Sequence, residues 1–196
     1  MLSDRTVLAH CVHFSDEEVD MLAERGTVAV HCPLSNLKLA SGIAPVPRMR
    51  QAGVSVTLGT DGAASGNDLD MWMAMRLAAV VHRGVHGDPT FLPAPEVVNM
   101  VTCDAARALG LGDRVGSLEV GKRADIIIID LNRPHLVPLY DVYSHLVYAV
   151  GRDDVSTVLI NGQIVMRNRQ LLTIDEEATM AEMRALAQRI AEATLV

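Results

Sequence analysis

Apolar and polar positions divide the first hundred residues into short apolar runs and longer segments of helical periodicity. Three apolar runs have the length and continuity of strands that are buried on both faces. These runs are Thr6–Cys11, Thr27–Cys32 and Val54–Leu58. Ser15 and Glu18 form a capping-box pattern before one helical segment, and another spans Asn67–Val81, with Asn67 or Asp68 as its N-cap. Alternating strands and helices predict βαβ units, and therefore a parallel sheet.

The pattern changes near Leu111, where strand and hairpin signals replace the alternation. The expected elements are a strand at Ala124–Asp130, two strands within Val155–Asn168 joined by a turn at Asn161–Gly162, and an amphipathic helix at Asp175–Ala193. Thr173 and Glu176 form a capping-box pattern at the start of that helix. We therefore expect two parts, residues 1–110 and residues 111–196.

Each of the three predicted parallel strands has a titratable side chain at or just after its carboxyl end: His10, His31 or Asp61. Sites in parallel α/β folds assemble at the carboxyl ends of strands, so these side chains are candidates for one site. Asp61 fits a metal ligand or a general base, but an aspartate before Gly62 is also common in turns. His31 fits a structural, hydrogen-bonded histidine equally well. Of His10 and His13, His10 at the strand end is the better candidate.

Two other motifs are weaker. Gly116–Arg123 nearly matches a phosphate-binding loop, but it precedes a strand and lacks the hydroxyl residue that would hold Mg²⁺, so we interpret it as a tight turn. His82 and His86 are four residues apart without the glutamate of a helical zinc motif, and we interpret them as residues of a loop or helix end.

Composition excludes several classes of function. The 196 residues carry a formal net charge of −7, which argues against a nucleic-acid partner or an acidic membrane surface. No run of about 18 apolar residues is present. The three cysteines are widely spaced, and the first residues lack the pattern of a secretion signal. We therefore expect reduced thiols and a cytoplasmic protein.

Four segments resemble the metal-dependent amidohydrolases, in the order in which that family has them. The segments are LAHCVHFSDEEVDMLAERG, VHCPLSNLKLASGIAPV, LGTDGAASGNDLDMWMAMRLAA and GSLEVGKRADIIIID. Within the family the sequence is most similar to the 5-methylthioadenosine/S-adenosylhomocysteine deaminases and their triazine-hydrolase relatives. The resemblance covers essentially the whole chain.

The resemblance implies an α/β fold: the carboxyl-terminal part of a (β/α)₈ barrel of the TIM type, followed by strands of a small β-sandwich and a terminal helix. The three parallel strands would be barrel strands six to eight. The implied reaction is hydrolysis of a C–N bond in an aminopurine nucleoside or related N-heterocycle by metal-activated water. A chlorotriazine or guanine is the alternative substrate.

The resemblance also implies roles for single residues. Asp61 would bind a catalytic Zn²⁺ or Fe²⁺ and take a proton from the attacking water. His10 would contact the leaving or polarised group of the substrate. His31, Ser35 and Asn36 would lie around the substrate pocket.

Barrel strands one to five, and with them most of the metal ligands, have no counterpart in this sequence. One metal ion is expected per complete site, so we expect the chain to be inactive by itself. Three interpretations stay open: an enzyme fragment, a split-enzyme subunit that needs an N-terminal partner chain, or a non-catalytic scaffold. Unpaired apolar strand edges also favour a homo-oligomer.

Overall fold

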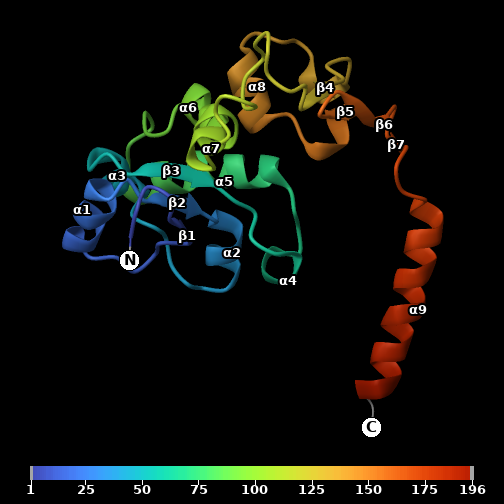
Figure 1. Ribbon diagram of the computed structural model, residues 1–196, viewed down its shortest axis with the longest axis horizontal. Helices are drawn as coiled ribbons and strands as arrows, with labels where there is room; N and C mark the ends of the chain where they lie inside the picture. The colour runs from blue at the N-terminus through green and yellow to red at the C-terminus, as the bar shows by residue number, and fades with distance from the viewer. Residues whose placement is uncertain (1, 195–196) are drawn as a thin grey trace. The chain divides into compact units, whose positions relative to one another are not determined.

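The computed structural model describes residues 2–194 and divides into two compact units (Figure 1). The first unit comprises residues 1–122 and 131–154, and the second comprises residues 123–130 and 155–196. The sequence predicted one boundary near Leu111, whereas the chain enters the second unit at Arg123, leaves it at Leu131 and returns after Asp154. The reason is strand pairing. Because β4 (Ile126–Ile129) pairs with β5 (Val155–Ile160), both strands belong to the second unit, while the segment between them belongs to the first.

The first unit contains a three-stranded parallel sheet in the order β1-β2-β3. Its strands are β1 (Val7–Ala9), β2 (Val28–His31) and β3 (Ser55–Leu58). The parallel arrangement confirms the prediction from the alternating pattern. Because the strands are parallel and adjacent, their carboxyl ends lie at one edge of the sheet.

Helices and short 3₁₀ turns complete the first unit. They are α1 (Asp16–Glu24), α2 (Pro33–Lys38), α3 (Val46–Gln51), α4 (Ala63–Gly66), α5 (Met71–His86), α6 (Ala94–Val101), α7 (Cys103–Ala108), η1 (Pro134–Leu136), α8 (Val142–Tyr148) and η2 (Arg152–Asp154). The predicted capping box of Ser15 and Glu18 opens α1. The start of α5 differs from the prediction, because Asp70 caps it and Asn67, in the left-handed region with φ 60°, ends α4 instead.

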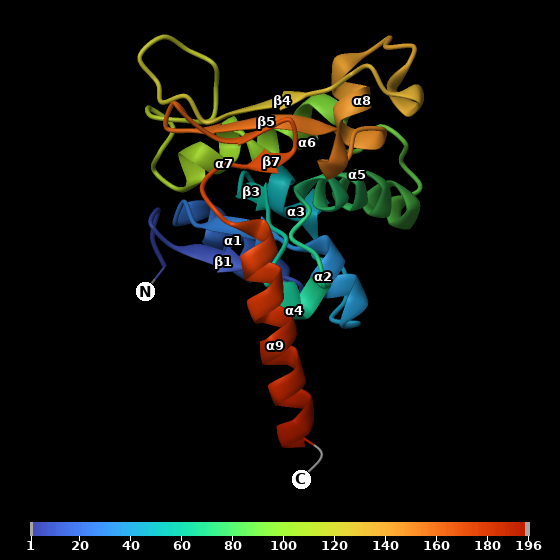
Figure 2. The same cartoon turned by 90° about the vertical axis from the view of Figure 1, so that its right-hand side faces the viewer.

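The core of the first unit forms where α5, α6 and α7 pack on β3 (Figures 1 and 2). Its fully buried side chains come from several helices, and include Val19, Leu22, Met49, Val97 and Met100. Burying side chains of this size stabilises the fold by about 1.5–3 kcal/mol each. Within residues 2–194, the structure has no helix that combines the length and the apolar character needed to cross a membrane.

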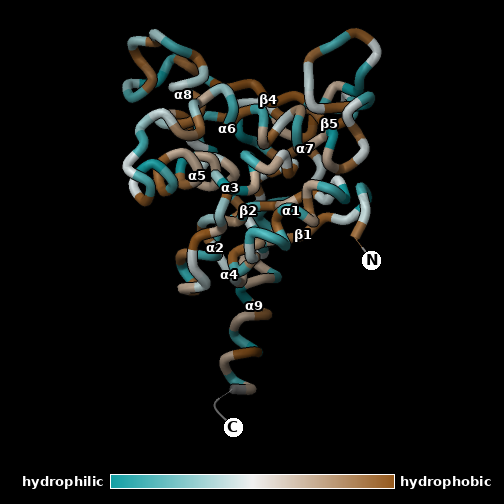
Figure 3. The backbone as a smooth tube through the Cα atoms, turned by 90° about the vertical axis from the view of Figure 1, so that its left-hand side faces the viewer, coloured by the Kyte–Doolittle hydropathy of each residue, from teal (hydrophilic) through white to brown (hydrophobic). Residues whose placement is uncertain are grey.

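The second unit contains an antiparallel sheet in the order β4-β5-β6-β7 and the helix α9 (Glu176–Thr194). Its remaining strands are β6 (Gln163–Arg167) and β7 (Gln170–Leu171). The predicted hairpin turn between β5 and β6 is confirmed, with φ of 51° at Asn161 and 80° at Gly162. Hydrophobic and hydrophilic positions alternate along α9 (Figure 3). Asp175 accepts from the N–H of Ala178, so it opens α9 in place of the predicted capping box at Thr173.

Candidate functional site

His10 and Asp61 follow the two outer strands of the parallel sheet, at the same edge. The backbone N–H of His10 donates to the carbonyl of Val30 in β2, which fixes the main chain at this point. Both residues have left-handed backbone conformations, with φ of 69° at His10 and 61° at Asp61. Such conformations are unfavourable for residues other than glycine and are concentrated at functional sites. The strand ends therefore present the two side chains at a cost in backbone strain.

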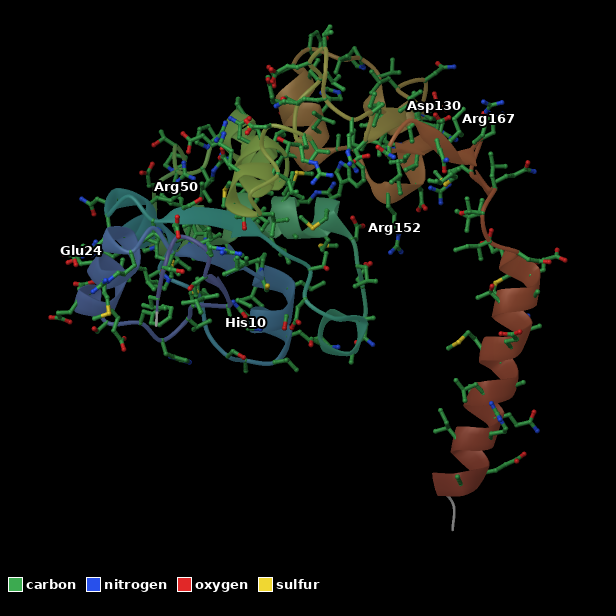
Figure 4. All side chains as sticks on the ribbon, viewed as in Figure 1. His10, Glu24, Arg50, Asp130, Arg152 and Arg167 are labelled. Carbon is green, nitrogen blue, oxygen red and sulfur yellow. The ribbon has the colours of Figure 1, made fainter. Side chains whose placement is uncertain are left out.

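Four predicted site residues lie together at this edge: His10, Ser35, Asn36 and Asp61, which we call the Asp61 cluster. The hydroxyl of Ser35 donates to Asp61 Oδ2 at 2.6 Å, and His10 Nε2 lies 3.9 Å from the same oxygen. On its other side, the His10 ring places Nδ1 2.8 Å from Asn36 Oδ1. Ser35 and Asn36 both belong to α2, and Figure 4 shows His10 beside that helix. A short helix thus supports both titratable side chains.

Hydrogen bonds to Asp61 stabilise its ionised form. The Ser35 hydroxyl makes the largest contribution, followed by the backbone N–H of Gly62, which donates to Asp61 Oδ1 at 2.7 Å, and the Ser65 hydroxyl. Together with the nearby His10, these donors lower the pKa of Asp61 to about 2. At neutral pH the carboxylate is charged and only weakly basic, which suits a ligand for a cation. Ser65 was missed by the sequence analysis, although a hydroxyl residue four positions after Asp61 is a usable signal.

The structure does not bring His31 to the Asp61 cluster. Its side chain is buried on the sheet beneath α5, where His31 Nε2 lies 3.3 Å from His82 Nε2. Burial disfavours the charged rings and lowers the pKa of His31 to about 3 and that of His82 to about 4. The two histidines are therefore a neutral pair in the interior. His82 is a fully buried residue of α5 rather than a loop residue.

The Asp61 cluster offers part of a metal site. Asp61 and His10 supply carboxylate and imidazole donors, both of which zinc accepts. Cys11 is buried nearby, but burial raises its pKa to about 11, so its thiol stays protonated and is a poor ligand. Within residues 2–194, no three His, Cys, Asp or Glu side chains are placed to hold one ion. A tight zinc site needs three or four protein ligands, so these residues fit one side of such a site without completing it.

The model of the amidohydrolase family matches residues 1–165 of the sequence. The chain belongs to the amidohydrolase family. The expected resemblance is thereby confirmed at the level of the family.

Two curated relatives are matched over less than half of their own length by this amidohydrolase chain. It is 53% identical over 192 residues to the 5-methylthioadenosine/S-adenosylhomocysteine deaminase of Desulforudis audaxviator, which covers 97% of the chain and 45% of that relative. It is 47% identical over 182 residues to the 5'-deoxyadenosine deaminase of Methanosarcina acetivorans, and this match covers 93% of the chain and 42% of that relative. The chain thus spans less than half the length of these relatives.

Solved structures extend the similarity to the coordinates. An adenosine deaminase from Xanthomonas campestris with bound zinc matches with a TM-score of 0.93 and 43% identity, over 97% of this chain and 44% of its own. The atrazine chlorohydrolase TrzN from Arthrobacter aurescens, complexed with zinc, matches with a TM-score of 0.85 and 34% identity. This match covers 94% of the present chain and 41% of TrzN. Both of those structures contain zinc.

Proposed function

We propose that this amidohydrolase chain forms one side of the active site of a metal-dependent deaminase acting on adenosine-type nucleosides. The Asp61 cluster is the observation that supports this function most directly, because it orients a charged carboxylate and an imidazole at one sheet edge. Identity to nucleoside deaminases, 53% and 47% in two relatives, favours a nucleoside over a triazine, since the triazine hydrolase is 34% identical.

The fold proposal follows from strand order. We assign β1, β2 and β3 to barrel strands six, seven and eight, and β4–β7 to the carboxyl-terminal share of a small β-sandwich. Parallel pairing between neighbours and polar side chains at the carboxyl ends support the barrel assignment. Antiparallel pairing throughout β4–β7 supports the sandwich assignment.

Within this proposal, Asp61 would bind the metal ion and take a proton from the attacking water. A divalent cation bound there would supply Lewis acidity that lowers the pKa of water toward neutrality. Ser35 and the N–H of Gly62 hold one carboxylate oxygen each, and so fix the orientation of the carboxylate. His10 Nε2 faces the same space, where it can contact the leaving amino group.

Ser35, Asn36 and His31 have supporting roles in this proposal. Ser35 and Asn36 are each about 1% exposed and bond to Asp61 and His10, so they act on those side chains rather than on the substrate directly. His31 lies in the interior at the end of β2, where its ring contacts that of His82 in α5 and takes no direct part in the site. The substrate pocket is then formed by these strand ends together with residues outside this chain.

We further propose that the chain by itself has no measurable deaminase activity. In this proposal Asp61 is the metal ligand that this chain provides, because His10 faces the substrate, and zinc needs further protein ligands to bind tightly. The missing ligands would come from the part of the relatives that this chain does not match. Zinc is the expected ion, with one per complete site.

Complementation tests this function. The chain is mixed with a separately produced polypeptide containing the unmatched part of the Desulforudis audaxviator relative, and the purified complex is assayed for zinc content and for ammonia release from 5'-methylthioadenosine. We expect about one zinc ion per complex and turnover, with neither in the chain alone. A chlorotriazine and guanine, assayed in parallel, should be turned over more slowly.

Two variants locate the activity. Asp61→Asn keeps a residue that tolerates the left-handed backbone and removes the charge, so it should abolish zinc binding and turnover. Asp113→Asn makes the same chemical change at an exposed position and should leave both unchanged. A stable complex without zinc or turnover would favour the non-catalytic scaffold, and full activity of Asp61→Asn would refute the assigned role.

A further inference from the structure

Asn36 is held in a fixed position beside the His10 ring. Its side chain is about 1% exposed. Its backbone N–H donates to the carbonyl of Cys32 at 3.0 Å, and its own carbonyl accepts from the N–H of Ser41 at 2.9 Å. The carboxamide therefore projects from a backbone that is fixed on both sides, and it has little freedom to follow movements of the ring.

The carboxamide makes a directional contact with His10. Asn36 Oδ1 lies 2.8 Å from His10 Nδ1, while Asn36 Nδ2 is buried without a hydrogen-bond partner among the described residues. A carboxamide oxygen only accepts, so Nδ1 must be the donor and carry the proton. In a neutral ring, Nε2 then has a free lone pair, and this nitrogen lies 3.9 Å from Asp61 Oδ2.

The backbone of His10 adds a second constraint. Its N–H is bonded to Val30, and its φ of 69° fixes the direction in which the side chain leaves the strand. Only the two side-chain torsions remain free to set the position of Nε2. The contact with Asn36 restricts both torsions, because it fixes the opposite corner of the ring.

We propose that Asn36 is a positioning residue for His10: it selects the tautomer with the proton on Nδ1 and aims the unprotonated Nε2 at the space beside Asp61. In that state Nε2 accepts a hydrogen bond from an N–H or O–H of the reacting species. The opposite tautomer could only donate one. This inference deepens the proposed function and rests on it for the chemistry of His10, but not for the tautomer itself.

Nitrogen NMR of the full chain, labelled with ¹⁵N-histidine and recorded at a pH where imidazole rings are neutral, tests the tautomer without any turnover. We expect His10 to be protonated on Nδ1 alone. His13, an exposed histidine of the same loop, serves as an internal reference and should show an average of both tautomers. A His10 ring protonated on Nε2 would overturn the proposal, because the Asn36 amide would then have to donate to Nδ1.

Variants of Asn36 separate positioning from simple packing. Asn36→Leu has a similar volume without the acceptor and should lose the single His10 tautomer, whereas Asn36→Asp keeps an acceptor and should retain it. In the complemented enzyme, Asn36→Leu should lower kcat by about tenfold to a hundredfold with little change in KM, and Asn36→Asp should recover most of that loss. If Asn36→Leu does not fold, the spectrum of the unmodified chain and of Asn36→Asp still decides the question.

Failure of this inference and failure of the proposed function give different results. If the complex shows no turnover but His10 has the fixed Nδ1–H tautomer, the positioning role of Asn36 is supported and the deaminase function is refuted. If the complex turns over substrate but the His10 tautomer is mixed, the deaminase function is supported and the positioning role is refuted. The same conclusion follows if folded Asn36→Leu has an unchanged tautomer and an unchanged kcat.

Discussion

His10 and His31 leave neighbouring strands at the same sheet edge, yet their side chains lie in different environments. His31 is the last residue of β2, where side chains alternate between the two faces, and it shares a face with buried Ala29. His10 comes after β1 has ended, and its positive φ turns the side chain toward Asp61. A single backbone torsion thus separates a residue of the candidate site from a residue of the interior.

The buried His31–His82 pair should make the stability of the chain depend on pH. Both folded pKa values, about 3 and about 4, lie below the value of 6.5 expected for an exposed ring. As the pH falls below that value, the unfolded chain takes up protons that the folded chain does not, so the free energy of unfolding decreases. We expect a loss of the order of 2 kcal/mol for each histidine between about pH 7 and about pH 5.

Urea unfolding followed by circular dichroism over this pH range measures the effect. Replacing both His31 and His82 by leucine should remove most of the slope, because no buried imidazole is then left to titrate. His13→Ala, at an exposed position, should leave the slope unchanged. An equal slope in the double variant would place the pH dependence elsewhere.

The candidate site was predicted from the sequence as far as strand ends allow. His10, Ser35, Asn36 and Asp61 do come together, since each follows or ends a parallel strand or opens the next helix. The sequence could not separate His31 from them, because its partner His82 lies 51 residues away on α5. Only the fold brings those two histidines into contact.

At the scale of elements, the capping box of α1 is a local device whose contribution can be measured. The N–H of Glu18 donates to Ser15 Oγ at 3.3 Å, and the N–H of Ser15 donates to Glu18 Oε2 at 2.8 Å. Ser15→Ala leaves the Glu18 N–H without its acceptor, and should lower the free energy of unfolding by about 1 kcal/mol. Urea titration measures the change. The same substitution at exposed Ser41 should have no effect, and an equal effect there would show that helix capping is not the cause.

Helix starts were predicted less well than strands. Asn67, Asp68 and Asp70 all have side chains that can cap, and the sequence alone gave no reason to choose Asp70. The structure uses Asn67 for a left-handed turn after α4, and this leaves Asp70 to accept from the N–H groups of Trp72 and Met73. Choices among adjacent capping residues depend on the path of the preceding loop, which local pattern does not reveal.

At the scale of the whole molecule, β1 and β3 are the outer strands of an open parallel sheet within the described residues. An unpaired strand edge can pair with another chain, so we expect self-association of the chain at micromolar concentration. Val7 of β1 is 44% exposed, and Val7→Lys should shift the chain toward monomer because a lysine on an edge strand opposes pairing. Sedimentation velocity measures the distribution.

Val80→Lys is the matched control for this experiment. Val80 has nearly the same exposure, 43%, but lies on the helix α5 and not on a strand. The Val80→Lys substitution should leave the self-association of the chain unchanged. Equal dissociation by both lysine variants would mean that added charge, and not the β1 edge, governs association.

The division of the molecule was the least predictable feature. Apolar runs identified β4, β5 and β6 in sequence, but the assignment of residues 131–154 to the first unit depends on contacts made by α8 with α5 and α6. The contacts with α5 join segments more than fifty residues apart, as in the bonds of Arg76 to the carbonyls of Val147 and Val150. The local pattern of apolar and polar residues contains no information about contacts between segments so far apart in the sequence.

The separation of β4 from its partner has a consequence during protein synthesis. During translation the four consecutive isoleucines of β4 are synthesised before η1, α8 and η2, and therefore well before their partner strand β5. Until then the nascent chain displays an uncharged β-forming run, which is prone to intermolecular association. Asp125 and Asp130 flank the run and oppose such association as gatekeepers. Asp125 thus protects the nascent chain before its carboxylate receives the N–H of Asn161 in the finished hairpin.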